Sequence, residues 1–220
     1  NFSTPMFFVG CRFAVAAAVI FLLSLKSMSG LTLKETLAGT AIGIMIAIGY
    51  GTQTIGLQSI LSSESAFLTA LYVPLVPILM WVIFQKSPSL MTWIGSALAF
   101  TGLVLLTGNG FSNITLFYGQ ILTLICALVI ALEIILIGYF AGRVNLRRVT
   151  VIQLMVAALL SFASMPLVGE HQLPAFSWPL LLIATGLGLA SALIQFVMNW
   201  AQSMVDPSRA AIIYAGEPVW

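Results

Sequence analysis

The chain has 220 residues, of which 60% are hydrophobic and 6% are charged, and its formal net charge is +2. A water-soluble domain carries roughly 25% charged residues, so this composition excludes an ordinary cytosolic enzyme, a nucleic-acid-binding protein and a disordered chain. Most of the surface is expected to face lipid.

Seven stretches are apolar enough and long enough for membrane-spanning helices, which need about 20 residues each. In chain order they cover about 4–25, 36–60, 65–84, 89–107, 114–141, 149–168 and 178–205, and an eighth begins near residue 208. Short loops join them, which predicts antiparallel neighbouring helices. The expected fold class is an all-α polytopic membrane protein.

The two ends of the chain and its two cysteines indicate less about the fold. The chain starts at Asn1 and stops at Trp220 within an apolar stretch, so we expect a fragment cut at both ends. Cys11 and Cys126 both lie in apolar stretches, which argues against a disulfide framework.

The basic residues predict the orientation of the chain. Seven of the eight lie in the odd-numbered loops: Lys26, Lys34, Lys86, Arg143, Arg147, Arg148 and Arg209. Cytoplasmic loops are enriched in Lys and Arg. We therefore expect the odd-numbered loops to be cytoplasmic and His171, in an even-numbered loop, to be external.

The sequence also contains a weak internal repeat. Aligning Pro74 with Pro218, an offset of 144 residues, sets residues 64–74 against 208–218, and an offset of 141 sets Arg12 against Gln153. The repeat displaces each helix by five spans, so matched helices run in opposite directions. Inverted repeats of this kind are common in secondary transporters, although duplicated membrane proteins without transport activity would show the same symmetry.

Several segments resemble the drug/metabolite transporter superfamily, EamA type. They are GYGTQTIGLQ at 49–58, AFLTALYVPLVP at 66–77, WAQSMVDPSRAA at 200–211 and EPV at 217–219. The resemblance implies ten helices in two inverted five-helix repeats, with 1–107 in the first and 114–220 in the second. The first helix, the tenth and most of the ninth would be missing. Many relatives carry a Gly-Glu pair after the fourth helix, where this chain has Phe84-Gln85.

Polar residues at helical spacing are the candidate substrate-binding residues. Gln195, Asn199 and Gln202 share one helix face, with Ser191 nearby, and an unsatisfied amide costs several kcal/mol in lipid. They either line a polar cavity or hold helices together, and Gln202 fits the second role better. The same alternatives hold for Tyr50 with Gln53. Tyr72 and Tyr214 either stack on a substrate or pack in the core.

Three charged residues lie inside the expected spans, where an ionisable group is a functional-site hypothesis by default. Arg12 lies about 10 Å below the outer surface, and we expect it to reach toward that surface. Glu133 and Glu217 lie about 14 Å in from the cytoplasmic side, close to the midplane. We expect Glu133 to face a substrate or a proton, and Glu217 to be mainly structural beside Pro218.

Glycine and proline suggest how the helices pack. Gly39, Gly43, Ala47 and Gly51 share one helix face, and Gly95, Ala99 and Gly102 share another. Small residues allow close helix packing, and a surface on which helices slide is the alternative. Pro74, Pro77 and Pro218 are expected to kink their helices.

The expected function is secondary transport of small metabolites or amphipathic organic compounds by alternating access in a bacterial-type inner membrane. The resemblance implies an exporter. The sequence has no catalytic constellation and no P-loop, so no enzyme activity, cofactor, metal or nucleic-acid partner is expected. Proton coupling and a homodimer remain open. The alternatives are a channel and a non-transporting membrane protein such as a receptor or an assembly factor.

Overall fold

The computed structural model describes residues 4–85, 87–107, 118–172, 174 and 177–216, and within these ranges the regular elements are all helical. In chain order they are α1 (Pro5–Ser24), η1 (Leu25–Ser27), α2 (Leu33–Gly56), α3 (Ser62–Thr69), α4 (Tyr72–Phe84), α5 (Leu90–Thr107), α6 (Tyr118–Phe140), α7 (Leu146–Ser164), η2 (Met165–Val168), α8 (Trp178–Gln202) and α9 (Pro207–Tyr214). Six segments, with α3 and α4 counted as one, are long and apolar enough to cross a membrane. The all-α polytopic class is confirmed. The stretch expected at 89–107 contains α5, whose described apolar part covers Leu90–Gly102.

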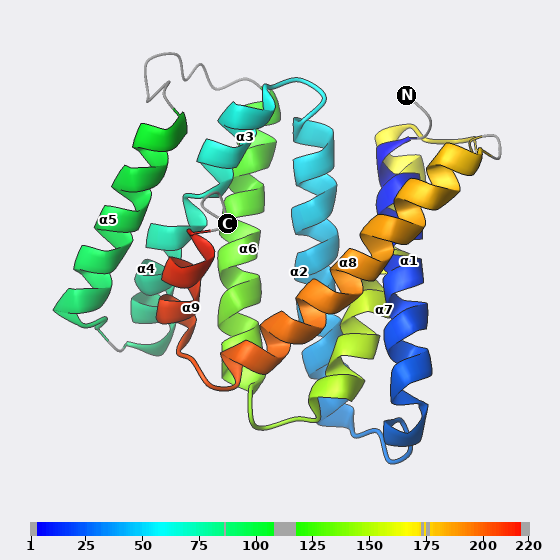
Figure 1. Ribbon diagram of the computed structural model, residues 1–220, viewed down its shortest axis with the longest axis horizontal. Helices are drawn as coiled ribbons and strands as arrows, with labels where there is room; N and C mark the ends of the chain where they lie inside the picture. Colours follow the sequence, from blue (N-terminus) through cyan, green and yellow to red (C-terminus); the bar gives the residue numbers. More distant parts are fainter. Residues whose placement is uncertain (1–3, 86, 108–117, 173, 175–176, 217–220) are drawn as a thin grey trace. The chain divides into compact units, whose positions relative to one another are not determined.

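The helices form two compact units (Figure 1). Unit 1 comprises Asn1–Gly51 and Phe140–Ser203, and unit 2 comprises Thr52–Tyr139 and Met204–Trp220. Each unit therefore combines helices from the first and the second half of the sequence. The predicted boundaries at 1–107 and 114–220 divide the chain differently, because they follow sequence repetition and not packing.

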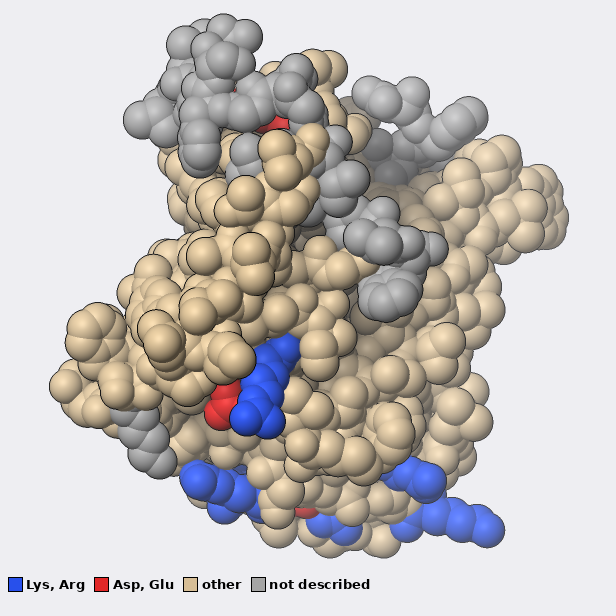
Figure 2. Space-filling model, turned by 60° about the vertical axis from the view of Figure 1, so that its left-hand side comes forward, with Lys and Arg blue, Asp and Glu red and all other residues tan. Residues whose placement is uncertain are grey.

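The surface matches the expected lipid environment. The face drawn in Figure 2 is almost free of charged side chains, and the visible Lys and Arg side chains gather mainly at its lower edge. Large apolar side chains such as Leu22, Leu159 and Leu193 are exposed, as a helix bundle surrounded by hydrocarbon requires.

The third expected span, 65–84, lies in the apolar segment Ser62–Phe84, which is long enough to cross a membrane. It breaks between α3 and α4, at Ala70 and Leu71. Pro74 causes the break, because it has no amide proton to give to the carbonyl four residues earlier and its ring clashes there. The carbonyl of Ala70 accepts instead from the amide of Val73, at 3.0 Å.

In unit 1, α1 packs against both α7 and α8. The contact with α8 is close at Gly188, where an added Cβ would lie 2.7 Å from the Cβ of Val15 and 2.8 Å from the carbonyl oxygen of Arg12. No larger side chain fits at Gly188 without a shift of α1 or α8.

A matching contact joins α2 to α7 in the same unit. An added Cβ at Gly43 would lie 2.6 Å from the carbonyl oxygen of Gln153 and 2.8 Å from the Cβ of Val156. Gln153 and Val156 follow the two α1 residues that contact Gly188 by 141 residues. Gly39 also packs on α7, at Ile152. The expectation that Gly39 and Gly43 permit close helix packing is confirmed.

The helix boundaries recur along the chain in the same way. α1 begins at Pro5 and α7 begins 141 residues later at Leu146, and each is followed by a 3-10 turn. Two further pairs, α2 with α8 and α3 with α9, both begin 145 residues apart. The spacing of the later pairs differs by one residue from the offset that the proline alignment gives.

In unit 2, α3 and α9 are both eight residues long and end with the same hydrogen bonds. The amides of Ala70 and Leu71 donate to the carbonyls of Ala66 and Leu68, and those of Ala215 and Gly216 donate to the carbonyls of Ala211 and Ile213. The second set lies 145 residues after the first.

Candidate substrate-binding site

Arg12 and Tyr50 form a polar contact inside unit 1. The guanidinium carbon of Arg12 lies 4.8 Å from the centroid of the Tyr50 ring, a cation–π geometry. Its Nε donates a hydrogen bond of 2.6 Å to Ser191 Oγ on α8. The Tyr50 ring also meets Phe13 edge-on, with 5.0 Å between centroids. The guanidinium is thus held by groups within the helix packing, whereas the sequence suggested that it reaches toward the outer surface.

The two predicted amides of α8 bond to α7. Gln195 is 2% exposed, and its Oε1 accepts from Nε2 of Gln153 at 3.0 Å. Asn199 is 4% exposed, and its Nδ2 donates to Oγ1 of Thr150 at 2.9 Å. These bonds satisfy buried polar atoms between two helices of unit 1, so each amide at least joins α8 to α7.

The Tyr50 and Gln195 positions are related by the spacing of the helices. Gln195 follows Tyr50 by 145 residues, and Gln153 follows Arg12 by 141. The Arg12–Tyr50 contact between α1 and α2 therefore occupies the position that the Gln153–Gln195 hydrogen bond occupies between α7 and α8. Both pairs are polar, and both lie between packed helices of unit 1.

Three of the other predicted residues lie in unit 2. Tyr72 is buried in an apolar cluster that includes Val76, Ile134 and Ala211, and Tyr214 packs against the same cluster. Glu133 is 4% exposed on α6, beside the Ile134 of that cluster. The tyrosines therefore lie against packed side chains from several helices.

Gln53 is partly buried on α2, at the part of that helix that belongs to unit 2. The structure thus divides the predicted residues between the units, with Tyr50, Gln195 and Asn199 in unit 1. Each of these residues stays a proposed substrate contact. Glu217 lies outside the described residues, as do Lys86 and Pro218.

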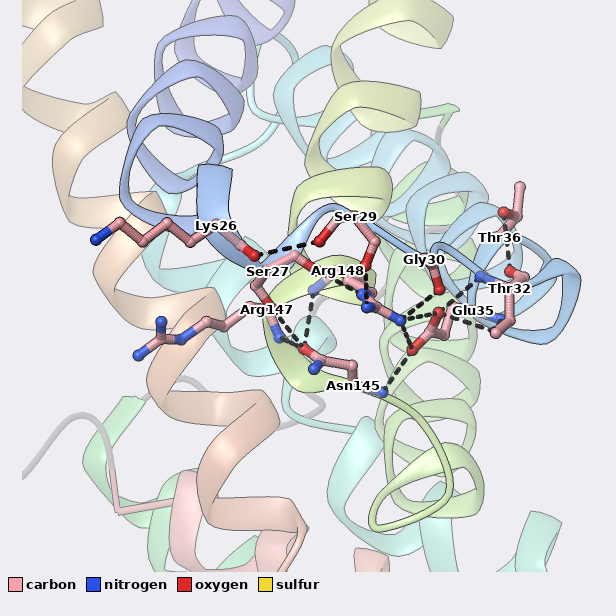
Figure 3. A network of polar contacts seen from close by, with 10 residues as sticks. All are labelled: Lys26, Ser27, Ser29, Gly30, Thr32, Glu35, Thr36, Asn145, Arg147 and Arg148. Atoms are coloured by element: carbon pink, nitrogen blue, oxygen red, sulfur yellow. Dashed lines mark hydrogen bonds and ion pairs between the residues drawn. The ribbon is translucent and has the colours of Figure 1, made fainter.

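A charged network at one end of unit 1 was not predicted from the sequence (Figure 3). Arg148, at the start of α7, donates from Nε to the carbonyl of Ser27 at 2.6 Å, and from its two terminal nitrogens to those of Ser29 and Gly30 at 2.5 and 2.8 Å. Its Nη1 also lies 3.0 Å from Oε2 of Glu35 in an ion pair. One side chain therefore ties the loop after α1 to the start of α2.

Glu35 is the centre of this network and is 5% exposed. It caps its own helix, because its Oε2 accepts from the amide and the hydroxyl of Thr32, both at 2.8 Å, and its amide donates to Thr32 Oγ1. Its Oε1 accepts from the amide of Asn145, which caps α7. The spacing of Thr32 and Glu35 matches a capping box and could have identified this role from the sequence.

Glu170 makes the corresponding contact at the other end of the unit. It follows α7, and its carboxylate accepts from the amides of Met6 and Phe7 in the first turn of α1, at 2.8 and 3.1 Å. The free amides and the helix dipole at an N-terminus favour a carboxylate there. Since the end of α7 meets the start of α1, and Arg148 at the start of α7 meets the residues after α1, these two helices run antiparallel.

Metal binding has no evident location in the described residues, where no group of three or more His, Cys, Asp and Glu side chains could hold an ion.

Lys26, Arg147 and Arg148 lie together at one end of unit 1 in Figure 3, as expected of odd-numbered loops that share one side of the membrane. The membrane side on which that end lies stays a prediction.

Comparison with known proteins identifies the family. Residues 1–108 match the EamA-like transporter family. A protein of Archaeoglobus fulgidus named an uncharacterized transporter is 30% identical over 219 residues, which cover all of this chain and 65% of the relative. The uncharacterized transporter YvbV of Bacillus subtilis is 25% identical over 160 residues, which are 72% of this chain and 52% of the relative. The chain thus spans less than two thirds of the length of either relative.

A solved crystal structure, 18% identical in sequence, has the same fold. It matches with a TM-score of 0.79 over 98% of this chain and 77% of its own chain. The family match of residues 1–108, the alignment of the whole chain with relatives named as transporters and the six apolar helices together show that the protein belongs to the EamA-like transporter family.

Proposed function

We propose that the complete protein is a secondary transporter that moves small metabolites or amphipathic organic compounds by alternating access. The observation that carries this proposal is the recurrence of helix boundaries and contacts between residues 1–107 and 114–220. The equivalent helices α1 and α7 run antiparallel, which supports an inverted repeat. Such repeats give a transporter two related conformations that open to opposite sides of the membrane.

The proposal extends to the intact protein, which would have ten helices in two five-helix repeats and lie in the cell membrane. Its direction is export. The chain is a multi-pass membrane protein, and relatives from two organisms are named as transporters.

The substrate contacts in this proposal are Tyr50, Gln53, Tyr72, Glu133, Gln195, Asn199 and Tyr214. Glu133 has a further role as the proton-facing carboxylate, because it is buried on α6 within a predominantly apolar unit. An ionisable group in such a place is a common element of a proton pathway.

The test is counterflow in liposomes that contain the full-length protein, preloaded with single metabolites and assayed with and without a proton gradient. A carrier transiently accumulates labelled substrate against its gradient while unlabelled substrate leaves, and it saturates, whereas a channel gives no such accumulation. Empty liposomes and liposomes with heat-denatured protein are the controls. Absence of exchange for every compound in a panel of amino acids, organic acids, amines and neutral aromatics would reject transport.

A further inference from the structure

Arg12 is a charged residue within an apolar helix. It lies seven residues after Pro5, the first residue of α1, and this corresponds to about 10 Å of helix. Lys and Arg side chains in such positions are costly unless an anion or polar groups compensate the charge. The contacts of Arg12 therefore indicate what it binds.

The protein contacts of Arg12 hold the guanidinium without neutralising it. Its Nε donates to Ser191 Oγ at 2.6 Å. The hydroxyl of Ser191 donates in turn to the carbonyl of Leu187 at 2.8 Å, so its oxygen is left as an acceptor for Arg12. Tyr50 and Phe13 contribute aromatic faces at 4.8 and 5.7 Å. None of these groups carries a negative charge.

The carboxylates of unit 1 are already engaged elsewhere. Among the described residues of this unit they are Glu35, which pairs with Arg148, and Glu170, which binds the first amides of α1. Within that part of the chain, no carboxylate lies within ion-pair distance of Arg12, and its Nη1 and Nη2 have no hydrogen-bond partner. Two parallel donors and one uncompensated positive charge therefore remain.

We propose that Arg12 binds the carboxylate of a monoanionic organic substrate through Nη1 and Nη2. Two adjacent guanidinium nitrogens match the two oxygens of a carboxylate, and a single negative charge neutralises Arg12 in a medium where an excess charge is costly. The rings of Tyr50 and Phe13 beside the guanidinium favour a substrate with an apolar or aromatic body. This inference names the substrate class of the transporter proposed above and rests on that function.

The first test measures binding to the purified full-length protein in dodecyl maltoside, which contains no phosphate group that could occupy Arg12. The probes are benzoate, pyruvate, hexanoate and indole-3-acetate, each compared with its neutral amide, together with inorganic phosphate. The readout is the concentration at which each compound raises the temperature of unfolding. At least one carboxylate should stabilise the protein where its amide does not, and phosphate should bind more weakly.

Three variants separate recognition by Arg12 from its structural role. Arg12→Gln should weaken carboxylate binding by about tenfold to a hundredfold, the usual effect of losing a charged hydrogen-bond partner. Arg12→Lys keeps the charge without the paired donors and should fall between. Ser191→Ala leaves the guanidinium intact but less oriented, and should weaken binding by a smaller factor. The lysine and alanine variants also serve if Arg12→Gln does not fold.

Two results would overturn the inference: no carboxylate binds more tightly than its amide, or folded Arg12 variants bind carboxylates as the unaltered protein does. Phosphate binding more tightly than every monocarboxylate would also overturn it. Counterflow in liposomes distinguishes this failure from failure of the proposed function. Exchange of neutral compounds that Arg12→Gln does not affect would support transport without recognition by Arg12. Arg12-dependent binding without exchange would support recognition without transport.

Discussion

Arg147 and Arg148 are adjacent arginines with different surroundings. Arg148 is 17% exposed in its side chain and bonds three backbone carbonyls as well as Glu35. The side chain of Arg147 is exposed and has no partner among the described residues. The difference follows from helix geometry, since successive residues on a helix point about 100° apart.

Replacing Arg148 by Gln should lower the free energy of unfolding by about 2–3 kcal/mol, because it leaves buried Glu35 without its cation and three carbonyls without their donor. Arg147→Gln is the matched control, since it removes the same charge one residue away and should change stability by less than about 0.5 kcal/mol. Thermal unfolding of the full-length protein in detergent measures both. Equal losses for the two variants would contradict the assigned role of Arg148.

The substrate role of Asn199 can be separated from its role in packing. Thr150→Val removes the partner of Asn199 on α7 but leaves the amide in place, whereas Asn199→Leu removes the amide. If Asn199 contacts substrate, Asn199→Leu should reduce transport by about tenfold, and Thr150→Val should leave it within about twofold at comparable folded yield. Parallel losses of transport and yield in both variants would assign Asn199 to packing alone.

At the residue scale, the sequence predicts contact partners that are close along the chain better than partners that are distant. The capping box of Thr32 and Glu35 is local, so its spacing alone indicates it. The contact of Arg12 with Ser191 joins residues 179 positions apart, and no local pattern encodes it. Arg12 was accordingly expected to extend along its own helix toward the surface.

At the scale of elements, close helix packing in unit 1 depends on a few positions. Gly188 brings α8 against α1, and Gly43 brings α2 against α7. Gly186 lies two residues before Gly188, and a Cβ added there would have nothing within 4 Å. The two glycines of α8 thus have the same residue type and different surroundings.

Gly188→Ala should lower the free energy of unfolding by about 1–3 kcal/mol, since its methyl group overlaps Val15 and the backbone of α1. Gly43→Ala should have a similar effect on the contact between α2 and α7. Gly186→Ala should leave stability unchanged or slightly increase it, because alanine favours the helix and meets no atom. Unfolding in detergent compares the three, and equal effects at Gly186 and Gly188 would contradict the packing.

Helix existence could be predicted from the sequence, and helix continuity could not. Apolar length identified the stretches that contain the described α-helices, with α3 and α4 in one stretch, because hydrocarbon demands that length. The break between α3 and α4 was expected only as a kink at Pro74. Pro74 leaves the carbonyl of Ala70 without its usual helical donor. Whether the proline bends or ends the helix depends on the new partner of that carbonyl, here the amide of Val73.

At the scale of the whole molecule, the chain interleaves its two halves. Unit 1 takes α1 and most of α2 from the first half and α7 and α8 from the second. The sequence could reveal the repetition, because related helices keep related residues. It could not reveal which helices of one half pack against helices of the other, since these neighbours are set by contacts such as that of Gly43 with Val156.

The orientation of the chain is open to a direct test. In a background without Cys11 and Cys126, the variant Arg147→Cys should stay unlabelled by an impermeant thiol reagent on intact cells and react after permeabilisation. His171→Cys should react on intact cells, because the distribution of Lys and Arg places its loop outside. Labelling of position 147 but not 171 on intact cells would reverse the orientation.

The contacts at the two ends of unit 1 set an order in time. Glu35 is synthesised 113 residues before its partner Arg148, and the amide of Met6 is synthesised 164 residues before Glu170. At about 5–20 residues per second, Glu35 waits roughly 6–23 s for its cation. During that interval Gly43 lacks its contact with α7, and the first amides of α1 lack the carboxylate of Glu170. The first half of the chain therefore cannot complete its fold as it leaves the ribosome, and a chain that stalls after α6 lacks these contacts for as long as it survives.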